Sequence, residues 1–520
     1  MAKINRRELL SDAGKGMVIA SVGSALAFDL GIAPAWCKET PDRLSFGNLD
    51  PLVDFIQETP AEKLLPQAAL KLKSGTSLQD LVGAAALANA RTFGGEDYVG
   101  FHTLMALAPA LAISREETDS RKAPLAVFKV LYRNATRLGE KGGATAQHVL
   151  KPLASDAGKS PTPNGESLRD TVRKQEMEKA DQAFSWICHS SPSEAVNPLM
   201  VMVDDGADVH RIVLVSRSLD LIGLVGKERA NTLLRQSVHY CVKAEKNNGY
   251  HKEVRAVLPK VLDENKLLGA VKTTRQADDR WVEETSMAIF KSSAAQAAGL
   301  VGASLREGMN PKHIFQAITL AANQLVLRDR GRYGGQIQGT VKPEGSVHGD
   351  SIGVHGCDSA NAWGNIAFSG DWRTCATSLI MAGYQVARDR VERGGEFLTW
   401  TPYPRGEHLE ETRAIGQEKL LSSLEEAVRA KNQGRAAALA WRLGQEAGQD
   451  REAFALLRKY SISEDGALHA EKFYRTSVED YAHTRPQFRP RFLAGLARVV
   501  ASAYGFPAPG LIQARDVLGV

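Results

Sequence analysis

Apolar residues at three- and four-residue spacing recur along almost the whole of this 520-residue chain, a pattern typical of amphipathic α-helices. Strand-like alternation of apolar and polar residues is scarce. Helices are expected over residues 61–72, 78–90, 123–138, 167–187, 227–243, 281–305, 312–327, 411–430, 435–447 and 451–460. The spacing therefore predicts an all-α fold, a large array of antiparallel helical hairpins around a central pocket.

Composition narrows the class of protein. Hydrophobic residues make up 43% and charged residues 24%, which favours a packed globular core over collagen-like, disordered or membrane-embedded chains. The net charge is only +5, and the basic residues lie along helical faces without interleaved aromatic residues, so no nucleic-acid partner is expected. Five cysteines without a Cys-x-x-Cys pair do not indicate a disulfide scaffold.

Residues 1–35 resemble a twin-arginine export signal. Arg6-Arg7 precedes an apolar run over 17–28, which is shorter than the ~20 residues of a membrane-spanning helix, and Ala33-Pro34-Ala35 offers a cleavage site. An amphipathic helix of the mature fold is the alternative. We expect the twin-arginine export machinery as a partner, a periplasmic or secreted product without a stable membrane span, and an all-α domain over 36–520. Residues 396–520 either continue this array or form a separate helical subdomain.

Histidines recur at the predicted starts of helices. His102, His210 and His355 each follow polar or glycine-bearing residues and precede an apolar helix, which looks like a degenerate internal repeat. Lys129 lies 27 positions after His102, and His239 lies 29 positions after His210. In antiparallel hairpins, residues separated in this way return to the same level.

These five residues are the predicted metal ligands. Neutral imidazoles suit iron, zinc, copper or nickel, and the interior of a helix bundle is a usual place to assemble them. The competing interpretation is structural, with histidines as caps or satisfied polar groups and Lys129 as a surface lysine. Asp208 and Asp358 are candidate catalytic residues, or acceptors that orient a neighbouring imidazole, with helix capping as the alternative.

Three stretches carry a resemblance to a known family. Tyr98-Val99-Gly100-Phe101-His102-Thr103-Leu104, Phe128-Lys129 and Val354-His355-Gly356-Cys357-Asp358-Ser359-Ala360-Asn361-Ala362 resemble the helix-start histidine motifs of the questin-oxidase-like group and its exported bacterial relatives. The resemblance implies an all-α fold and a mononuclear non-haem iron held mainly by histidines, in some members with a carboxylated lysine. It also implies oxygen-dependent cleavage of polycyclic aromatic substrates. Cys357-Asp358 and the export signal depart from the family pattern.

The leading prediction is therefore an exported non-haem iron oxidoreductase, an oxygenase acting on an apolar or aromatic small molecule. One alternative is a zinc hydrolase that uses the same pocket with Asp208 or Asp358 as the base. Another is a non-enzymatic helical binding or scaffold protein. No organic cofactor site is predicted, and His251, His348 and His469 have no assigned role.

Overall fold

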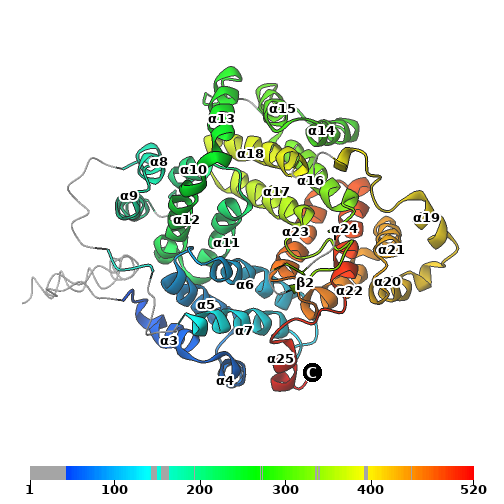
Figure 1. The fold of residues 1–520 in the computed structure, drawn as a ribbon, viewed down its shortest axis with the longest axis horizontal. Helices are drawn as coiled ribbons and strands as arrows, with labels where there is room; N and C mark the ends of the chain where they lie inside the picture. The colour runs from blue at the N-terminus through cyan, green and yellow to red at the C-terminus, as the bar shows by residue number, and fades with distance from the viewer. Residues whose placement is uncertain are drawn as a thin grey trace, which may run out of the picture.

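The computed structural model describes residues 43–141, 149–153, 163–191, 194–269, 271, 273–333, 336–337, 340–391, 396–446 and 448–520. Within these ranges the chain consists of helices joined by loops, and the strands β1 (Gln336–Ile337) and β2 (Thr340–Val341) form a minimal hairpin. The predicted all-α fold is confirmed (Figure 1). The expected export signal lies outside the described residues.

The first half of the chain supplies the left and lower parts of Figure 1 and reaches the top of the view with α13. Its α-helices and 3₁₀ helices (η) are η2 (Gly47–Leu49), α3 (Asp50–Glu58), α4 (Ala61–Lys73), α5 (Leu78–Phe93), α6 (Tyr98–Glu116), α7 (Leu125–Glu140), α8 (Gly165–Arg173), α9 (Met177–Ser190), α10 (Val196–Val203), α11 (Val209–Val225), η4 (Lys227–Arg229), α12 (Ala230–Ala244), η5 (Glu245–His251) and α13 (Lys252–Glu264).

The second half continues in the same way. Its elements are α14 (Asp279–Lys291), α15 (Ala294–Arg306), α16 (Pro311–Arg328), α17 (Ile352–Ser369), α18 (Trp372–Val391), η6 (Glu396–Leu398), α19 (Gly406–Arg413), η7 (Gln417–Lys419), α20 (Leu420–Arg429), α21 (Gln433–Gln445), α22 (Asp450–Ser463), α23 (His469–His483), η8 (Pro486–Phe488), α24 (Arg489–Ala503) and α25 (Leu511–Leu518).

Three helices expected to be continuous are each divided in two. The span 167–187 breaks into α8 and α9 at Gln175, which has a left-handed backbone with φ +58°. The span 281–305 breaks into α14 and α15, because Ser293 accepts a hydrogen bond from Gln296 N and starts a new helix. The span 411–430 breaks into α19 and α20. Apolar spacing continues across such short breaks, so periodicity alone did not reveal them.

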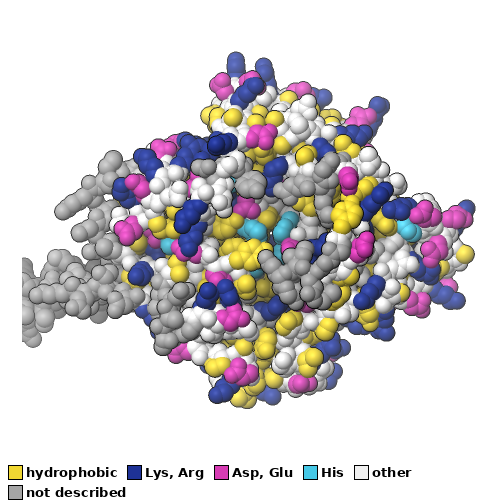
Figure 2. All heavy atoms as spheres, viewed as in Figure 1, with side chains coloured by type: hydrophobic (Ala, Val, Ile, Leu, Met, Phe, Trp, Pro, Cys, Tyr) yellow, Lys and Arg dark blue, Asp and Glu magenta, His cyan; other side chains and the backbone are white. Residues whose placement is uncertain are grey.

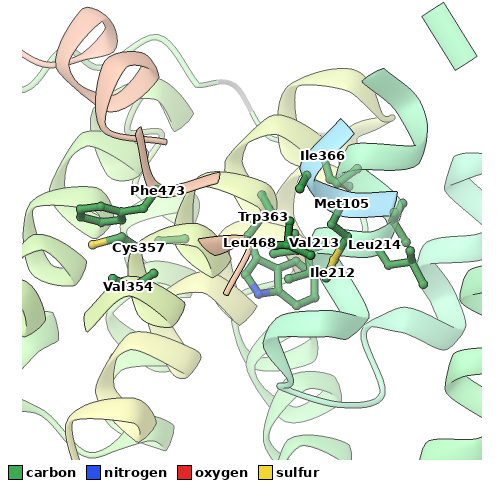
Figure 3. Packing of buried hydrophobic residues seen from close by; sticks show 14 of the residues in the cluster. Met105, Ile212, Val213, Leu214, Val354, Cys357, Trp363, Ile366, Leu468 and Phe473 are labelled. Atoms are coloured by element: carbon green, nitrogen blue, oxygen red, sulfur yellow. The ribbon is translucent and has the colours of Figure 1, made fainter. Parts of the chain in front are cut away.

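One hydrophobic core extends through the molecule and includes side chains from α3 to α25. Figure 3 shows part of it, where Met105 of α6, Ile212 of α11 and Trp363 of α17 lie close to Leu468, the residue before α23. Full burial of one such side chain stabilises the fold by about 1.5–3 kcal/mol. Packing of this kind holds these helices against one another.

The C-terminal helices pack among earlier ones. α23 lies against α6 and α17, α24 against α16 and α21, and α25 against α4 and α7. As a result, the first turns of α6, α11, α17 and α23 meet near the centre of the molecule (Figure 1). Among the described helices, none combines the length and the apolarity needed to cross a membrane.

Candidate metal centre

Four imidazole rings meet where these helices begin. They belong to His102 of α6, His210 of α11, His355 of α17 and His469 of α23, and are called the histidine cluster below. The Nε2 atoms of His102 and His210 lie 3.3 Å apart, and those of His355 and His469 lie 2.9 Å apart. The two pairs are also close to each other. The ring centroids of His102 and His469 lie 5.1 Å apart, and those of His210 and His355 lie 5.7 Å apart. Three of the five predicted ligands are thus brought together, with His469 as a fourth member.

Backbone carbonyls fix the tautomer of two of these rings. His102 Nδ1 lies 2.7 Å from the carbonyl oxygen of Tyr98, and His469 Nδ1 lies 3.0 Å from that of Ala467. Because a carbonyl can only accept, each Nδ1 carries the proton and donates it. The lone pair of each ring is therefore on Nε2, which faces the interior of the cluster.

Asp208 performs the same task for His210. Its Oδ1 lies 3.4 Å from His210 Nδ1 and accepts a hydrogen bond from the backbone N–H of His210, while Tyr240 Oη donates to the other carboxylate oxygen. Both interpretations of Asp208, the helix cap and the acceptor that orients an imidazole, therefore apply. A carboxylate behind a histidine in this way is typical of metal-ligating imidazoles.

The surroundings favour neutral imidazoles. Burial lowers the pKa of His355 to about 3, and the nearby His210 and Lys472 act in the same direction. Burial and Lys472 also hold the pKa values of His102 and His469 well below 6.5. The positive ends of four helix dipoles further disfavour protonation. Because His102 holds its proton on Nδ1, its Nε2 lone pair faces Nε2 of His210 at 3.3 Å, where it can accept a hydrogen bond or bind a shared cation.

The backbone before His469 is strained. Ala467 and Leu468 both have left-handed conformations, with φ +50° and +66°, although neither is glycine. Such residues cost on the order of 1–3 kcal/mol each and cluster at functional sites. Leu468 is only 3% exposed, and burial of its side chain in the core offsets part of that cost. The chain therefore holds His469 in place by a strained turn that core packing maintains.

Sequence reasoning left His469 unassigned although a signal was present. Gly466 precedes it and a helix follows it, as for the other three histidines. The residues after it, Ala470-Glu471-Lys472, are more polar than those after His102 or His355. Because the pattern was defined by a histidine followed by an apolar helix, this polar start did not match it.

His239 does not join the cluster, contrary to expectation. Its Nδ1 lies 2.9 Å from Glu96 Oε1 and its Nε2 lies 2.9 Å from Asp181, so both ring nitrogens already have carboxylate partners. As expected, α12 runs back to the level of His210. The residue that contacts the Asp208–His210 pair there is Tyr240, which directly follows His239. Adjacent helical residues point in directions about 100° apart, and this rotation turns His239 toward α9.

Lys129 is also placed differently from the prediction. Its Nζ forms a buried ion pair with Glu471 at 2.6 Å and donates to the carbonyl oxygens of Ile462 and Glu464, each at 3.0 Å. These acceptors suit an ammonium and would repel a carboxylated lysine. The part of α7 that lies level with the start of α6 comes after Lys129 in the chain, since Asn134 accepts a hydrogen bond from Thr103.

A different lysine lies beside the cluster. Lys472 is 2% exposed and follows His469 by three positions, which places both on one face of α23. Burial lowers its pKa to about 8, opposed by the negative charges of Asp358 and Glu471. Its charge lowers the pKa of His102, His355 and His469, as described above. Sequence reasoning missed Lys472 because it missed His469.

Asp358 lies on α17, three positions after His355. It is 2% exposed and accepts a hydrogen bond from Thr476 Oγ1 at 2.9 Å. Burial raises its pKa, and the nearby charges of Lys472 and Arg217 oppose that effect. Its neighbours make it a partner of the lysine on α23 rather than a group that reaches a substrate.

The donor set fits a transition metal ion. Imidazole nitrogens suit iron, zinc, copper and nickel, whereas calcium and magnesium prefer oxygen ligands. Within the described ranges, no group of three or more histidine, cysteine, aspartate or glutamate side chains is placed so that it could hold a metal ion. Binding one ion to all four rings therefore requires the rings to move.

One side of the cluster is open to solvent. His102 and His469 are 3% and 2% exposed, whereas the His210 side chain is 14% exposed. The ring of Tyr98, 47% exposed, lies 4.4 Å from that of His102, and Val99 beside it is 41% exposed. Figure 2 shows histidine side chains near the centre of this face, next to hydrophobic ones. A molecule reaching the cluster would meet an aromatic, apolar edge.

A comparison of the chain with protein families, curated proteins and solved structures finds no match.

Proposed function

We propose that this protein is an exported, metal-dependent oxidoreductase, an oxygenase in which His102, His210, His355 and His469 bind one iron ion. The observation that carries this proposal is the convergence of Nε2 atoms, with their Nδ1 atoms held by Tyr98 O, Asp208 and Ala467 O. Bound iron would supply the one-electron chemistry that dioxygen needs and that side chains lack. The residues themselves hold the ligand tautomers and exclude water from the buried side.

The ligand number favours iron over zinc. Zinc with four protein ligands is typical of closed structural sites, whereas catalytic zinc usually keeps three protein ligands and one open position. Non-haem iron accepts further ligands beside its histidines. The partly exposed edge at His210 and His355 leaves room for such ligands. A zinc hydrolase remains the second candidate, with Asp208 as the base.

An apolar or aromatic small molecule is the proposed substrate. Tyr98 and Val99 expose hydrophobic surface directly beside His102, and Phe101 stacks on the same ring with centroids 4.9 Å apart. Contiguous exposed hydrophobic side chains rimmed by polar residues mark binding surfaces. Asp208 and Tyr240 lie next to this edge and can orient His210 while the substrate binds.

In this proposal Lys472, rather than Lys129, is the lysine that becomes carboxylated. It lies on the same face of α23 as His469, is buried, and has a lowered pKa, which eases loss of the proton that carboxylation requires. A carboxylated Lys472 would also bring negative charge to a centre with neutral ligands, and Arg217 beside it would offset repulsion from Asp358 and Glu471. NMR after growth with ¹³C-bicarbonate tests this point, because Lys472→Met should remove a carbamate signal that Lys129→Met retains.

The central test is metal analysis of the purified full-length chain, combined with oxygen consumption in the presence of apolar aromatic compounds. We expect about one iron per chain, lost in His355→Ala and retained in a variant of the exposed His189, His189→Ala. Stoichiometric zinc without iron would favour the hydrolase. Absence of any transition metal, after loading with iron and with zinc, would contradict both enzymes and favour a binding or scaffold protein. Cell fractionation before and after Arg6→Lys/Arg7→Lys substitution tests export.

A further inference from the structure

A cavity of about 480 Å³ lies where α8, the end of α10, α13 and the start of α18 come together. These helices gather at the upper left of Figure 1. Pockets for small organic molecules have volumes of about 300–1,000 Å³, so this cavity has the size of a ligand site. The described residues that line it include none of the four cluster histidines. The cavity is therefore separate from the proposed metal centre.

One part of the cavity wall is apolar. Val254, Leu258 and Leu262 are buried residues at four-residue spacing, which places them on one face of α13. Leu268, in the segment after α13, also lines the cavity and is 65% exposed. Covering this leucine with an apolar group would remove hydrophobic surface from water, which is favourable. This part of the wall suits a hydrocarbon body.

Another part of the wall is rich in arginine. The residues that contribute are Arg169 and Arg173 of α8, Arg255 of α13 and Arg373 of α18, and between 21% and 35% of each side chain is exposed. A planar guanidinium group can bind a carboxylate through two parallel hydrogen bonds. This part of the wall suits an organic anion.

Buried carboxylates hold two of these arginines. Arg173 donates to Asp205 at 2.6 and 2.8 Å, and Arg373 donates to Asp204 at 3.3 Å. The side chains of Asp204 and Asp205 are only 3% and 9% exposed, so the two guanidinium groups are more accessible than the carboxylates beneath them. A molecule in the cavity would therefore meet the arginines first.

The remaining charges of the wall lie on exposed residues. Two carboxylates belong to Glu166 and Asp263, and Lys266 adds a fifth cation. Water screens charges on exposed side chains, so these three have less influence inside the cavity than the arginines. Five cations thus line the cavity with four carboxylates, and two of those carboxylates are covered. The accessible charge inside the cavity is positive.

Two of the arginines have donors left for a ligand. Arg169 pairs with Glu166, while its buried Nε has no hydrogen-bond partner among the described residues. Toward the residues that the structure describes, Arg373 donates through Nη1 alone. A buried N–H without an acceptor is costly, and a carboxylate oxygen in the cavity would supply that acceptor.

We propose that this cavity binds a small organic carboxylate with an apolar body. Its charged group would contact the arginines, and its hydrocarbon part would lie against α13 and Leu268. An inorganic anion would leave the apolar wall and most of the volume unused. The site does not depend on the proposed function, because it shares no lining residue with the histidine cluster.

Isothermal titration calorimetry of the purified full-length chain with three eight-carbon compounds tests the chemistry of the ligand. We expect one octanoate to bind per chain, octan-1-ol to bind roughly 10-fold more weakly or less, and octylammonium to show no binding, because a charge-assisted hydrogen bond is stronger than a neutral one. Equal binding of octanoate and octylammonium, or no binding of octanoate, would overturn the proposal.

Substitution of one arginine locates the charged group. Arg169→Gln should weaken octanoate binding roughly 10-fold, since it removes a charged donor and leaves no buried carboxylate unpaired. Arg413→Gln is the matched control, because Arg413 also pairs with a glutamate three residues earlier, on a helix that does not line the cavity. That variant should bind octanoate as the wild type does.

Substitution of one leucine locates the apolar body. Leu268→Asp should weaken octanoate binding by a similar factor or more, because it places a carboxylate where the hydrocarbon would lie. Leu70→Asp is the control, since Leu70 is 64% exposed and does not line the cavity. Both leucines are largely exposed, so neither change disturbs the hydrophobic core. Wild-type affinity in both Arg169→Gln and Leu268→Asp would overturn the site.

His355→Ala separates this site from the proposed metal centre. The variant should bind octanoate with wild-type affinity whether or not the protein contains iron. Loss of octanoate binding in His355→Ala, together with wild-type binding in Arg169→Gln, would place octanoate at the histidine cluster and overturn the proposal. Absence of metal from a chain that binds octanoate as described would contradict the proposed function alone.

Discussion

The histidine cluster and the surroundings of His239 place the same side chain in two buried settings with opposite results. In the cluster, His102 and His469 donate from Nδ1 to backbone carbonyls, and burial keeps their pKa values well below 6.5. At His239, burial acts in the same direction, but Asp181 and Glu96 outweigh it and raise the pKa. A carbonyl fixes a neutral tautomer, whereas a carboxylate at each nitrogen stabilises the imidazolium.

This difference distinguishes a histidine that can bind a metal ion from a charged histidine that only forms ion pairs with carboxylates. A neutral ring with its proton on Nδ1 leaves Nε2 free to bind a cation, and a ring protonated on both nitrogens cannot do so. The two kinds of histidine should therefore respond in opposite ways to substitution, to pH and to loss of their partners.

Removal of His469 should have the largest effect on metal binding. His469→Ala deletes a ligand, so we expect iron affinity to fall by more than the roughly 10–100-fold typical for partners that only orient ligands. Titration of the metal-free protein with iron(II) under anaerobic conditions measures the change. The matched variant His239→Ala should bind iron as the wild type does, and equal losses in both variants would remove the distinction between the two settings.

Removal of His239 should instead destabilise the fold. His239→Ala removes the cation that Glu96 and Asp181 share and leaves them Lys243 and Arg235, so we expect a cost on the order of 1–3 kcal/mol. Urea denaturation of the metal-free protein measures the free energy of unfolding. His469→Ala, measured in the same way, should cost less, because its ring makes no ion pair. If His239→Ala unfolds at the wild-type urea concentration, the ion cluster contributes no stability.

Tyr240 tests the orientation of one ligand. Tyr240→Phe removes the hydrogen bond to Asp208, which holds His210, and we expect iron affinity to decrease about 10-fold with little change in stability. Tyr132→Phe, a substitution of a partly buried tyrosine on α7, serves as the control. An unchanged affinity in Tyr240→Phe would mean that Asp208 positions His210 without help.

The smallest expected effect concerns pH. The pKa of His239 is raised in the folded protein above its ordinary 6.5, so its ion pairs add stability that is fully present below pH 6.5. That contribution is lost as the pH rises through the folded pKa. Thermal unfolding of the wild type and His239→Gln across pH 5 to 9 should converge at the alkaline end. Parallel curves would show that His239 does not carry the charge.

The sequence was sufficient for much of the fold because long apolar periodicity marks helices whatever their partners are. It predicted α5, α7 and α16 closely, but it could not show the break at Gln175, where one left-handed residue turns the chain. For the site, the helix-start pattern brought His102, His210 and His355 together correctly.

The remaining site residues depended on information that spacing does not contain. The 29-residue spacing predicts that α12 returns to the level of His210, but it does not predict which face of α12 meets His210. The residue that does so is Tyr240, directly after His239. His469 lies in the last fifth of the chain, and its approach depends on packing of α23 against α6 and α17. Tertiary contacts of this kind cannot be read from local periodicity.

Anomalous diffraction at the iron absorption edge, from crystals of the iron-loaded protein, tests the central claim most directly. The account predicts a single peak within bonding distance of the Nε2 atoms of His102, His210, His355 and His469, with no peak at His239. A peak among Glu96, Asp181 and His239, or no peak in protein that was exposed to excess iron, would contradict it.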